Sequence, residues 1–177
     1  MIFRERLETE DLFLGKASYD DWRALYQNIW SKEESARHML WSVAKSEEAA
    51  QEKMRRALAW EKDHPSYTVY EKAGGQAIGW AGVVETAPGV WEDTGIALGP
   101  DYTGRGYGKQ VLNALVRYCR EELDAEEFIC AYRAGNLPSR SMVLSCGFHY
   151  DHAEERTDPR NGCGYVLEFF KKRLQEK

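Results

Sequence analysis

The stretch from Gly95 to Gly108, GIALGPDYTGRGYG, constrains the fold of this chain more than any other part of it. It predicts a strand that enters a glycine-rich turn, and the turn opens directly onto an amphipathic helix over residues 109–123. The turn's glycines carry no Cβ atoms, so backbone N–H groups can converge on one concavity at the positive end of that helix. This arrangement predicts a site for an anion, and phosphate is its natural occupant.

Length and composition favour one globular domain over residues 1–177. The chain is 30% charged and 43% hydrophobic, so it can bury a core without a metal or a disulfide. Its net charge of −5 argues against nucleic acid or an anionic membrane as the main partner. No run approaches the ~18 apolar residues of a membrane helix, and no apolar leader is visible. With no metal-ligand spacing among its cysteines, the chain is expected to be cytoplasmic, with mostly buried, reduced thiols and no bound metal.

Hydrophobic periodicity predicts an α/β order of elements. Before the glycine turn we expect a strand over 11–15, helices over 19–30 and 47–63, and an antiparallel meander of strands over 67–71, 77–85 and 90–98. After the 109–123 helix we expect a strand over 128–132, a helix over 136–146 and strands over 148–153 and 164–170. The 128–132 strand should run parallel to the strand before the turn, because a helical crossover connects the two.

Between the two N-terminal helices, residues 31–41 show no clear period. His38, Met39 and Trp41 lie close together there, so this segment is either a corner of the core or a wall of a substrate-binding site. The N-terminal third also contains the tryptophans Trp22, Trp30 and Trp41. They pack in the core, line an acceptor groove or form a homodimer contact.

Two well-known phosphate motifs do not fit the glycine turn. A Walker A loop needs glycine where this chain has Thr103, and serine or threonine where it has Gln110. A dinucleotide fingerprint that starts at Gly104 or at Gly106 lacks its third glycine. The turn is therefore either the cradle of another phosphate-bearing ligand or a glycine-rich helix entry without a ligand.

The residues around the turn resemble a known family. Y-T-G-R-G-Y-G-K follows a strand ending in A-L-G-P, and an amphipathic helix, a strand, N-x-x-S and a later G-F follow it. This combination is similar to the GCN5-related N-acetyltransferase (GNAT) family, and most similar to its ribosomal-protein N-terminal acetyltransferase (RimJ/RimL-type) branch. The resemblance spans essentially the whole chain and implies a GNAT fold: a mixed, mostly antiparallel sheet of about six or seven strands flanked by about four helices.

The resemblance implies that acetyl-CoA is the cofactor and that the turn holds its pyrophosphate. The implied contacts are main-chain groups of Ile96, Ala97 and Leu98 along the pantetheine arm, and the turn residues Thr103, Gly104, Arg105, Gly106, Tyr107, Gly108 and Lys109. Thr103 departs from the arginine or glutamine that is usual in the family, although the backbone donors are unaffected. Arg105 or Lys109 either supplies charge to a phosphate or stays solvated.

The family pattern also implies groups for acetyl transfer. A backbone N–H near Leu98, where related folds carry a bulge, is expected to stabilise the developing oxyanion. The tyrosine that many relatives use as an acid falls at Val143, so Ser139 is expected to lie near the cofactor sulfur, with Asn136 bonding the pantetheine amide. The other interpretation of Ser139 is that it only helps to start its helix.

An amine acceptor is mostly protonated at neutral pH, so a carboxylate base would help the reaction. Asp93 is the candidate that we prefer, with Glu92 and Glu85 as alternatives, although each is also explained as an exposed charge at a strand end. His38 and His149 are weaker candidates. No cysteine is expected to act as a nucleophile, because an apolar setting disfavours the thiolate.

The sequence thus predicts direct acetyl transfer from acetyl-CoA to a primary amine, with the α-amine of a protein or peptide as the expected acceptor. Within enzymes the alternative is a small amine, such as a polyamine or an aminoglycoside. A non-catalytic acyl-CoA-binding protein is the alternative outside enzymes, and it rests on Thr103 and on the missing tyrosine.

Overall fold

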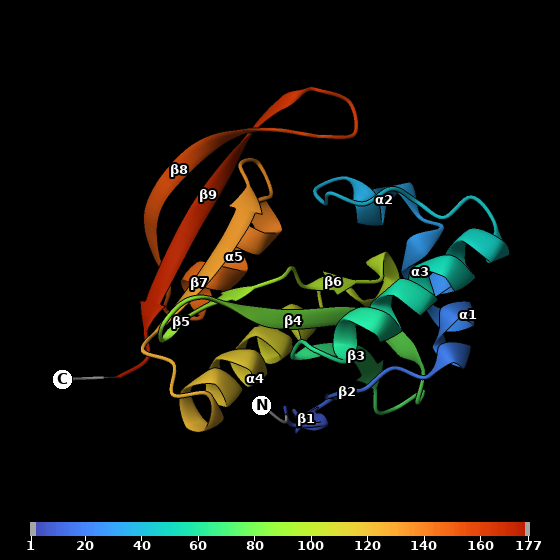
Figure 1. The fold of residues 1–177 in the computed structure, drawn as a ribbon, viewed down its shortest axis with the longest axis horizontal. Helices are drawn as coiled ribbons and strands as arrows, with labels where there is room; N and C mark the ends of the chain where they lie inside the picture. Colours follow the sequence, from blue (N-terminus) through green and yellow to red (C-terminus); the bar gives the residue numbers. More distant parts are fainter. Residues whose placement is uncertain (1–2, 176–177) are drawn as a thin grey trace.

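The computed structural model describes residues 3–175 and forms an α/β fold around one sheet (Figure 1). The strands are β1 (Arg6–Glu8), β2 (Leu12–Gly15), β3 (Ser66–Glu71), β4 (Ala77–Ala87), β5 (Val90–Asp93), β6 (Ala97–Leu98), β7 (Glu127–Arg133), β8 (His149–Thr157) and β9 (Gly164–Arg173). The helices are α1 (Trp22–Leu25), α2 (Glu33–Ala36), α3 (Glu47–Glu61), α4 (Tyr107–Glu122) and α5 (Leu137–Ser145). None of these helices is long and apolar enough to cross a membrane.

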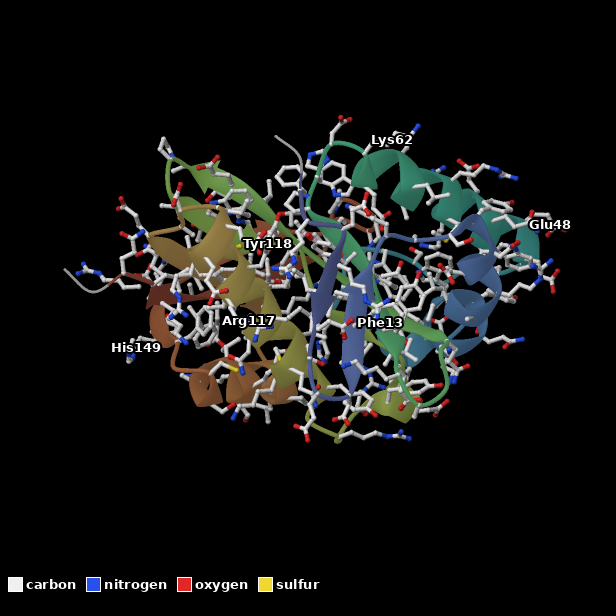
Figure 2. The ribbon with its side chains drawn as sticks, turned by 90° about the horizontal axis from the view of Figure 1, so that it is seen from below. Phe13, Glu48, Lys62, Arg117, Tyr118 and His149 are labelled. Carbon is white, nitrogen blue, oxygen red and sulfur yellow. The ribbon has the colours of Figure 1, made fainter. Side chains whose placement is uncertain are left out.

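The strand order is β1-β2-β3-β4-β5-β7-β9-β8, and β6 pairs with β4 beside β5. Successive residues of β2, β3 and β4 alternate between two core clusters, as expected of strands covered on both faces. One cluster contains Leu14 and Val69 and extends to α4 and α5, while the other contains Phe13 and Tyr70 and extends to α1 and α3. Figure 2 shows Tyr118 on α4 lying beside the β1–β2 pair.

The predicted strand over 90–98 is wrong as one element, because residues 94–96 leave the sheet between β5 and β6. β5 pairs with β4 around Val83, and β6 pairs with the same strand at Gly79. Gly95 takes φ 103°, and its N–H donates to the carboxylate of Asp93 at 2.9 Å. On the side away from β4, β5 pairs with β7 in parallel, as predicted. Within residues 3–175, β6 pairs with β4 alone, so the sheet opens between β6 and β7.

The other differences from the sequence prediction concern elements that are short or rich in polar residues. The sheet has nine strands instead of six or seven, partly because β1 contains only one apolar residue, Leu7. The predicted helix over 19–30 is a 3-10 turn, the single α-turn of α1 and a π turn in succession. The last two strands run on to Thr157 and Arg173 through polar residues that apolar spacing does not reveal.

Gly79 permits the close approach of β4 and β6. A Cβ built on it would lie 2.2 Å from the carbonyl oxygen of Ala97, which is backbone and cannot swing aside. We therefore expect Gly79→Ala to lower the free energy of unfolding by about 1–3 kcal/mol, measured by urea denaturation. Gly164→Ala is the control, because the nearest atom there is 3.9 Å away. Equal urea midpoints for the two variants would contradict this packing.

Candidate active site

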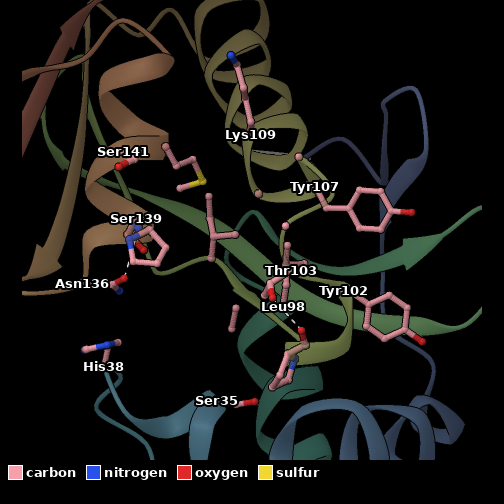
Figure 3. A pocket seen from close by; sticks show the side chains of 18 of the residues that line it. Ser35, His38, Leu98, Tyr102, Thr103, Tyr107, Lys109, Asn136, Ser139 and Ser141 are labelled. Atoms are coloured by element: carbon pink, nitrogen blue, oxygen red, sulfur yellow. Dashed lines mark hydrogen bonds between the residues drawn. The ribbon is translucent and has the colours of Figure 1, made fainter.

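A cavity of about 630 Å³ lies between the glycine turn and α5 (Figure 3). Strand β6, the turn and the start of α4 form one wall, α5 forms another, and residues of α2 and the segment after it close the base. Its lining includes the predicted cofactor residues Ile96, Ala97, Leu98, Thr103, Gly104, Gly106, Tyr107, Gly108, Lys109, Asn136 and Ser139. The fold thus brings the two halves of the sequence motif to one cavity.

The glycine turn presents backbone donors to this cavity. Gly104 and Gly106 take φ values of 74° and 78°, and open space surrounds the position of a Cβ at each. The first backbone bond of the turn into α4 is from Gln110 N–H to the Gly106 carbonyl at 3.1 Å. Within the described residues, the N–H groups of residues 104–109 have no hydrogen-bond partner. Together with the N-terminus of a 16-residue helix, they can hold an anion.

Behind the turn, the buried carboxylate of Glu71 binds two side chains of the turn. Glu71 accepts from the Tyr107 hydroxyl at 2.7 Å and from Arg105 at 3.3 Å. Arg105 also donates to the Asp101 carbonyl at 3.1 Å, and it does not line the cavity. Thr103 donates to the Pro100 carbonyl at 2.8 Å, which stabilises the turn itself. Of the two cations considered for the phosphates, Lys109 is therefore the one at the cavity wall.

Leu98 points its N–H toward the opening of the sheet. The N–H of Gly99 donates to the Ile78 carbonyl on β4 at 2.8 Å, and Leu98 lies opposite Gly79. In an antiparallel pair, the residue between such bonds directs its own N–H and C=O to the other edge of the strand. The Leu98 N–H therefore faces away from β4. The break in the strand lies just before it, at residues 94–96, and not at Leu98 itself.

Asn136 and Ser139 start α5 together. Asn136 is the N-cap, and its side-chain oxygen accepts from the backbone N–H of Ser139 at 3.3 Å (Figure 3). The amide nitrogen of Asn136 and the hydroxyl of Ser139 have no hydrogen-bond partner in the described part of the chain. Val143, at the position of the family's usual tyrosine, is fully buried in the core.

A second cavity of about 600 Å³ opens on the other side of Ser139. The two cavities share five lining residues, namely His38, Met39, Ile96, Asn136 and Ser139. The second cavity is walled by aromatic side chains from distant elements: Trp41, Trp80, Tyr132 and Tyr165. Residues of the segment 31–41 thus line both cavities, and Trp41 also packs against the core cluster that contains Tyr70.

Asp93 lies buried at the wall of this second cavity, at the end of β5. Its carboxylate accepts from the Gly95 N–H at 2.9 Å and from the Tyr132 hydroxyl at 3.3 Å. Burial raises the pKa of this carboxyl to about 6, although these hydrogen bonds lower it. Glu92 beside it lines the same cavity, and burial raises its pKa as well. A carboxyl with a pKa of about 6, such as that of Asp93, suits proton transfer near neutral pH.

The other candidate bases lie elsewhere or have other partners. Glu85 accepts from the Gly89 N–H at 3.1 Å and closes the β4–β5 turn. His149 is exposed on β8 at the outer edge of the molecule (Figure 2) and lines neither cavity, whereas His38 lines both. Cys130 is buried, and burial raises the pKa of its thiol well above the ordinary value, so a thiolate is disfavoured there.

Sequence reasoning missed several residues of the second cavity, including Trp80, Tyr132, Arg133 and Tyr165. Tyr132 and Arg133 end β7 just before the N-x-x-S motif, so their position next to that motif was a usable signal. Trp80 and Tyr165 come from β4 and β9, and nothing in their local sequence distinguishes them from core or surface aromatics.

A split sheet, a glycine-rich turn with unpaired backbone donors and a capped helix facing that turn across one cavity are the arrangement that the sequence motif led us to expect of an acyl-CoA-dependent transferase. A family model described as the acetyltransferase (GNAT) domain matches residues 11–149. The chain belongs to this family.

Solved structures of the same fold include several acetyltransferases. A putative ribosomal-protein-serine acetyltransferase from Vibrio cholerae is 22% identical, with a TM-score of 0.82 over 98% of this chain and 99% of that one. RimL, described as a ribosomal L7/L12 alpha-N-protein acetyltransferase in complex with coenzyme A, is 17% identical, with a TM-score of 0.80 over 96% and 98%. The microcin self-immunity acetyltransferase MccE, in complex with acetyl-CoA and AMP, is 16% identical, with a TM-score of 0.80 over 93% of each chain. At these identities the likeness concerns the fold.

Proposed function

We propose that this protein transfers the acetyl group of acetyl-CoA to the α-amine of a protein or peptide. The observation that carries the proposal is the meeting of two cavities at Ser139, one with free backbone donors and the other with a buried carboxylate. Two of the structural neighbours named above act, by their descriptions, on ribosomal proteins, which supports a protein acceptor. They also support a place in the RimJ/RimL-type branch.

The first cavity fits acetyl-CoA by the chemistry of its lining. The free N–H groups of residues 104–109 and the ammonium of Lys109 suit the pyrophosphate. Ala97 and Leu98 of β6 provide an extended main chain for the pantetheine arm, with Ile96 just before them at the cavity wall, and the free amide nitrogen of Asn136 provides a donor to one of its carbonyls. When bound there, acetyl-CoA supplies an activated acetyl thioester.

Three groups of the chain then have separate tasks at the reacting centre. The Leu98 N–H would donate to the thioester carbonyl oxygen and stabilise the negative charge that develops on it. The Asp93 carboxylate accepts the proton that the acceptor ammonium must lose, directly or through a water molecule. As the amine nitrogen bonds to the acetyl carbon and the carbon–sulfur bond breaks, the Ser139 hydroxyl would donate a hydrogen bond to the departing sulfur. The proton that the attacking nitrogen then loses balances the proton that the thiolate takes up.

An acceptor panel tests the proposal. Purified protein is incubated with acetyl-CoA and with peptides that carry free or formylated N-termini, a polyamine and an aminoglycoside, and thiol release is measured. We expect thiol release with the peptides that have a free N-terminus, and only background thiol release with the formylated peptides. Turnover of the small amines alone would establish the small-molecule alternative. If acetyl-CoA binds but releases no thiol in the presence of any acceptor, the protein is a non-catalytic acyl-CoA-binding protein.

Gly106 gives a direct test of the cofactor cradle. A β-branched residue at φ 78° is strained and would tilt the neighbouring N–H groups away from the phosphate. Acetyl-CoA at about a hundredfold excess over its Kd should stabilise the wild type by about 2.7 kcal/mol, seen as a higher Tm. We expect Gly106→Val to lose most of this shift, whereas Gly162→Val, with φ 74° in the β8–β9 turn, should keep it. An undiminished shift in Gly106→Val would contradict the cradle.

A further inference from the structure

The loop over residues 37–43, between α2 and α3, reaches both cavities. His38 and Met39 line both of them, and Trp41 lines the second. The loop contains no helix or strand. In the described part of the chain, Arg160 is the only residue outside α2 that forms hydrogen bonds with this loop. The position of the loop at the cavities therefore depends on few contacts.

Arg160 binds the loop through two of its backbone carbonyls. The guanidinium donates to the carbonyl oxygen of Trp41 at 2.6 Å and to that of Met39 at 3.0 Å. Because the guanidinium presents its N–H groups in a rigid planar fork, two carbonyls bound at once fix the path of the chain between them. Packing does not fix it there, since Leu40 is 55% exposed. The Trp41 ring packs on Trp80, with their ring centroids 5.4 Å apart.

Asp158 holds the guanidinium of Arg160 in place. The Nε of Arg160 donates to one carboxylate oxygen at 2.9 Å, and a terminal nitrogen donates to the other at 2.6 Å. The same carboxylate accepts from Arg133, at the end of β7, at 2.8 Å, and Asp158 is only 2% exposed. Hydrogen bonds to Arg160 and Arg133 hold the pKa of Asp158 well below its usual range, so this carboxyl is ionised at neutral pH.

The turn between β8 and β9 gives this pair a fixed base. The Arg160 N–H donates to the Asp158 carboxylate at 3.0 Å, and the Asp158 N–H donates to the Cys163 carbonyl at 2.8 Å. Beside the turn, the Arg133 guanidinium lies 4.1 Å over the ring of Tyr165 on β9. The tip of the β8–β9 hairpin is thereby tied both to β7 and to the loop that follows α2 (Figure 1).

Resting on the proposed function, we propose that Arg160 is a positioning residue for the acceptor. With Asp158 it forms a clasp that holds residues 37–43 in the arrangement that the acceptor binds. Without the clasp the loop would sample other arrangements, and the apparent affinity for the acceptor would fall by the fraction of molecules that keep the right one. The KM for the acceptor should then rise, whereas kcat at saturation should change little.

Arg160→Met tests the clasp, because methionine keeps an unbranched apolar stem and removes all the donors. If about one molecule in ten keeps the clasped arrangement, the KM for the best peptide of the panel should rise about tenfold at almost unchanged kcat. The rise in Tm with acetyl-CoA should persist, since the free N–H groups of residues 104–109 are intact. Arg160→Lys, whose single ammonium replaces the fork, should give an intermediate KM.

Arg117→Met is the matched control. Arg117 also donates to a backbone carbonyl, that of Glu8 at 2.9 Å, but it lines neither cavity. We expect its KM for the peptide to equal that of the wild type. Asp158 stays paired with Arg133 in Arg160→Met, so this variant should fold, and its Tm without ligand checks that it does.

A second measurement follows the loop itself and needs no acceptor. Trypsin cleaves after arginine, and Arg37 is exposed at the start of the loop. Since cleavage tracks the population of the opened form, the fragment that ends at Arg37 should appear about tenfold faster in Arg160→Met than in the wild type or Arg117→Met. Mass spectrometry of the digest identifies the fragment.

The outcomes separate this inference from the proposed function. An unchanged peptide KM in Arg160→Met would overturn the inference and leave acetyl transfer intact. A fall in kcat at unchanged KM would assign Arg160 a general structural role and would also overturn it. Equal cleavage rates after Arg37 would overturn it whether or not the protein acetylates a peptide. Absence of acetylation with every acceptor in the wild type would instead contradict the proposed function, and the trypsin comparison would still decide whether Arg160 holds the loop.

Discussion

Replacing Asp93 with asparagine is expected to lower kcat/KM by about 10²- to 10⁴-fold, the usual contribution of a positioned general base. Asparagine keeps the size of the side chain and an oxygen that can accept from the Gly95 N–H, but it cannot take a proton. Stopped-time assays of thiol release from acetyl-CoA, with the panel's best peptide, measure the loss. The Tm of the variant should stay close to that of the wild type.

The pH profile identifies the cause of this loss. In the folded protein the pKa of Asp93 is raised to about 6 by burial, so the carboxyl is protonated below that pH and cannot act as a base. Wild-type kcat/KM should therefore rise as the pH increases through about 6, and the rise assigned to this group should be missing in Asp93→Asn. Glu85→Gln is the matched control, because that carboxylate caps a turn. A variant profile that still rises through the same pH would assign the base to another group.

Ser139→Ala carries the second large expected effect. Loss of the hydroxyl removes the donor to the departing sulfur, and we expect kcat to fall by about 10²-fold. The rise in Tm with acetyl-CoA should persist, since the backbone donors of the turn and the Asn136 cap remain. A fall in kcat without a loss of cofactor binding separates a hydroxyl that donates to the sulfur from a residue that only starts α5, because alanine keeps the backbone N–H that Asn136 caps.

Ser31→Ala is the control for this substitution, because that hydroxyl is exposed and bonds the Tyr26 carbonyl. Full turnover by Ser139→Ala would show that the sulfur leaves without this hydroxyl.

The parts of the fold that depend on local pattern were predictable from the sequence. The strands over 66–71 and 77–87 show strand periodicity, and the glycines at 104 and 106 lie where backbone with positive φ opens a helix. The parallel pairing of β5 with β7 followed from the handed crossover through α4. These features sufficed to place the glycine turn, Asn136 and Ser139 at one cavity.

The rest depends on contacts between residues that are distant in the sequence. The break between β5 and β6 occurs inside an apolar run, and the Gly95 to Asp93 bond that shapes it appears only in three dimensions. The second cavity is lined by residues of β4, β7, β9 and the segment after α2. Arg160 bonds a carbonyl 121 residues away at Met39, a contact that no local motif can indicate.

Mass spectrometry of an acceptor peptide after incubation with acetyl-CoA tests the central claim most directly. If the two cavities meet as an acetyl donor site and an amine site, the peptide should gain an acetyl group on its N-terminal nitrogen, with an equal amount of free thiol formed. Asp93→Asn and Ser139→Ala should reduce both products together. A protein that acetyl-CoA stabilises, but that leaves every peptide and small amine unmodified, would contradict the claim.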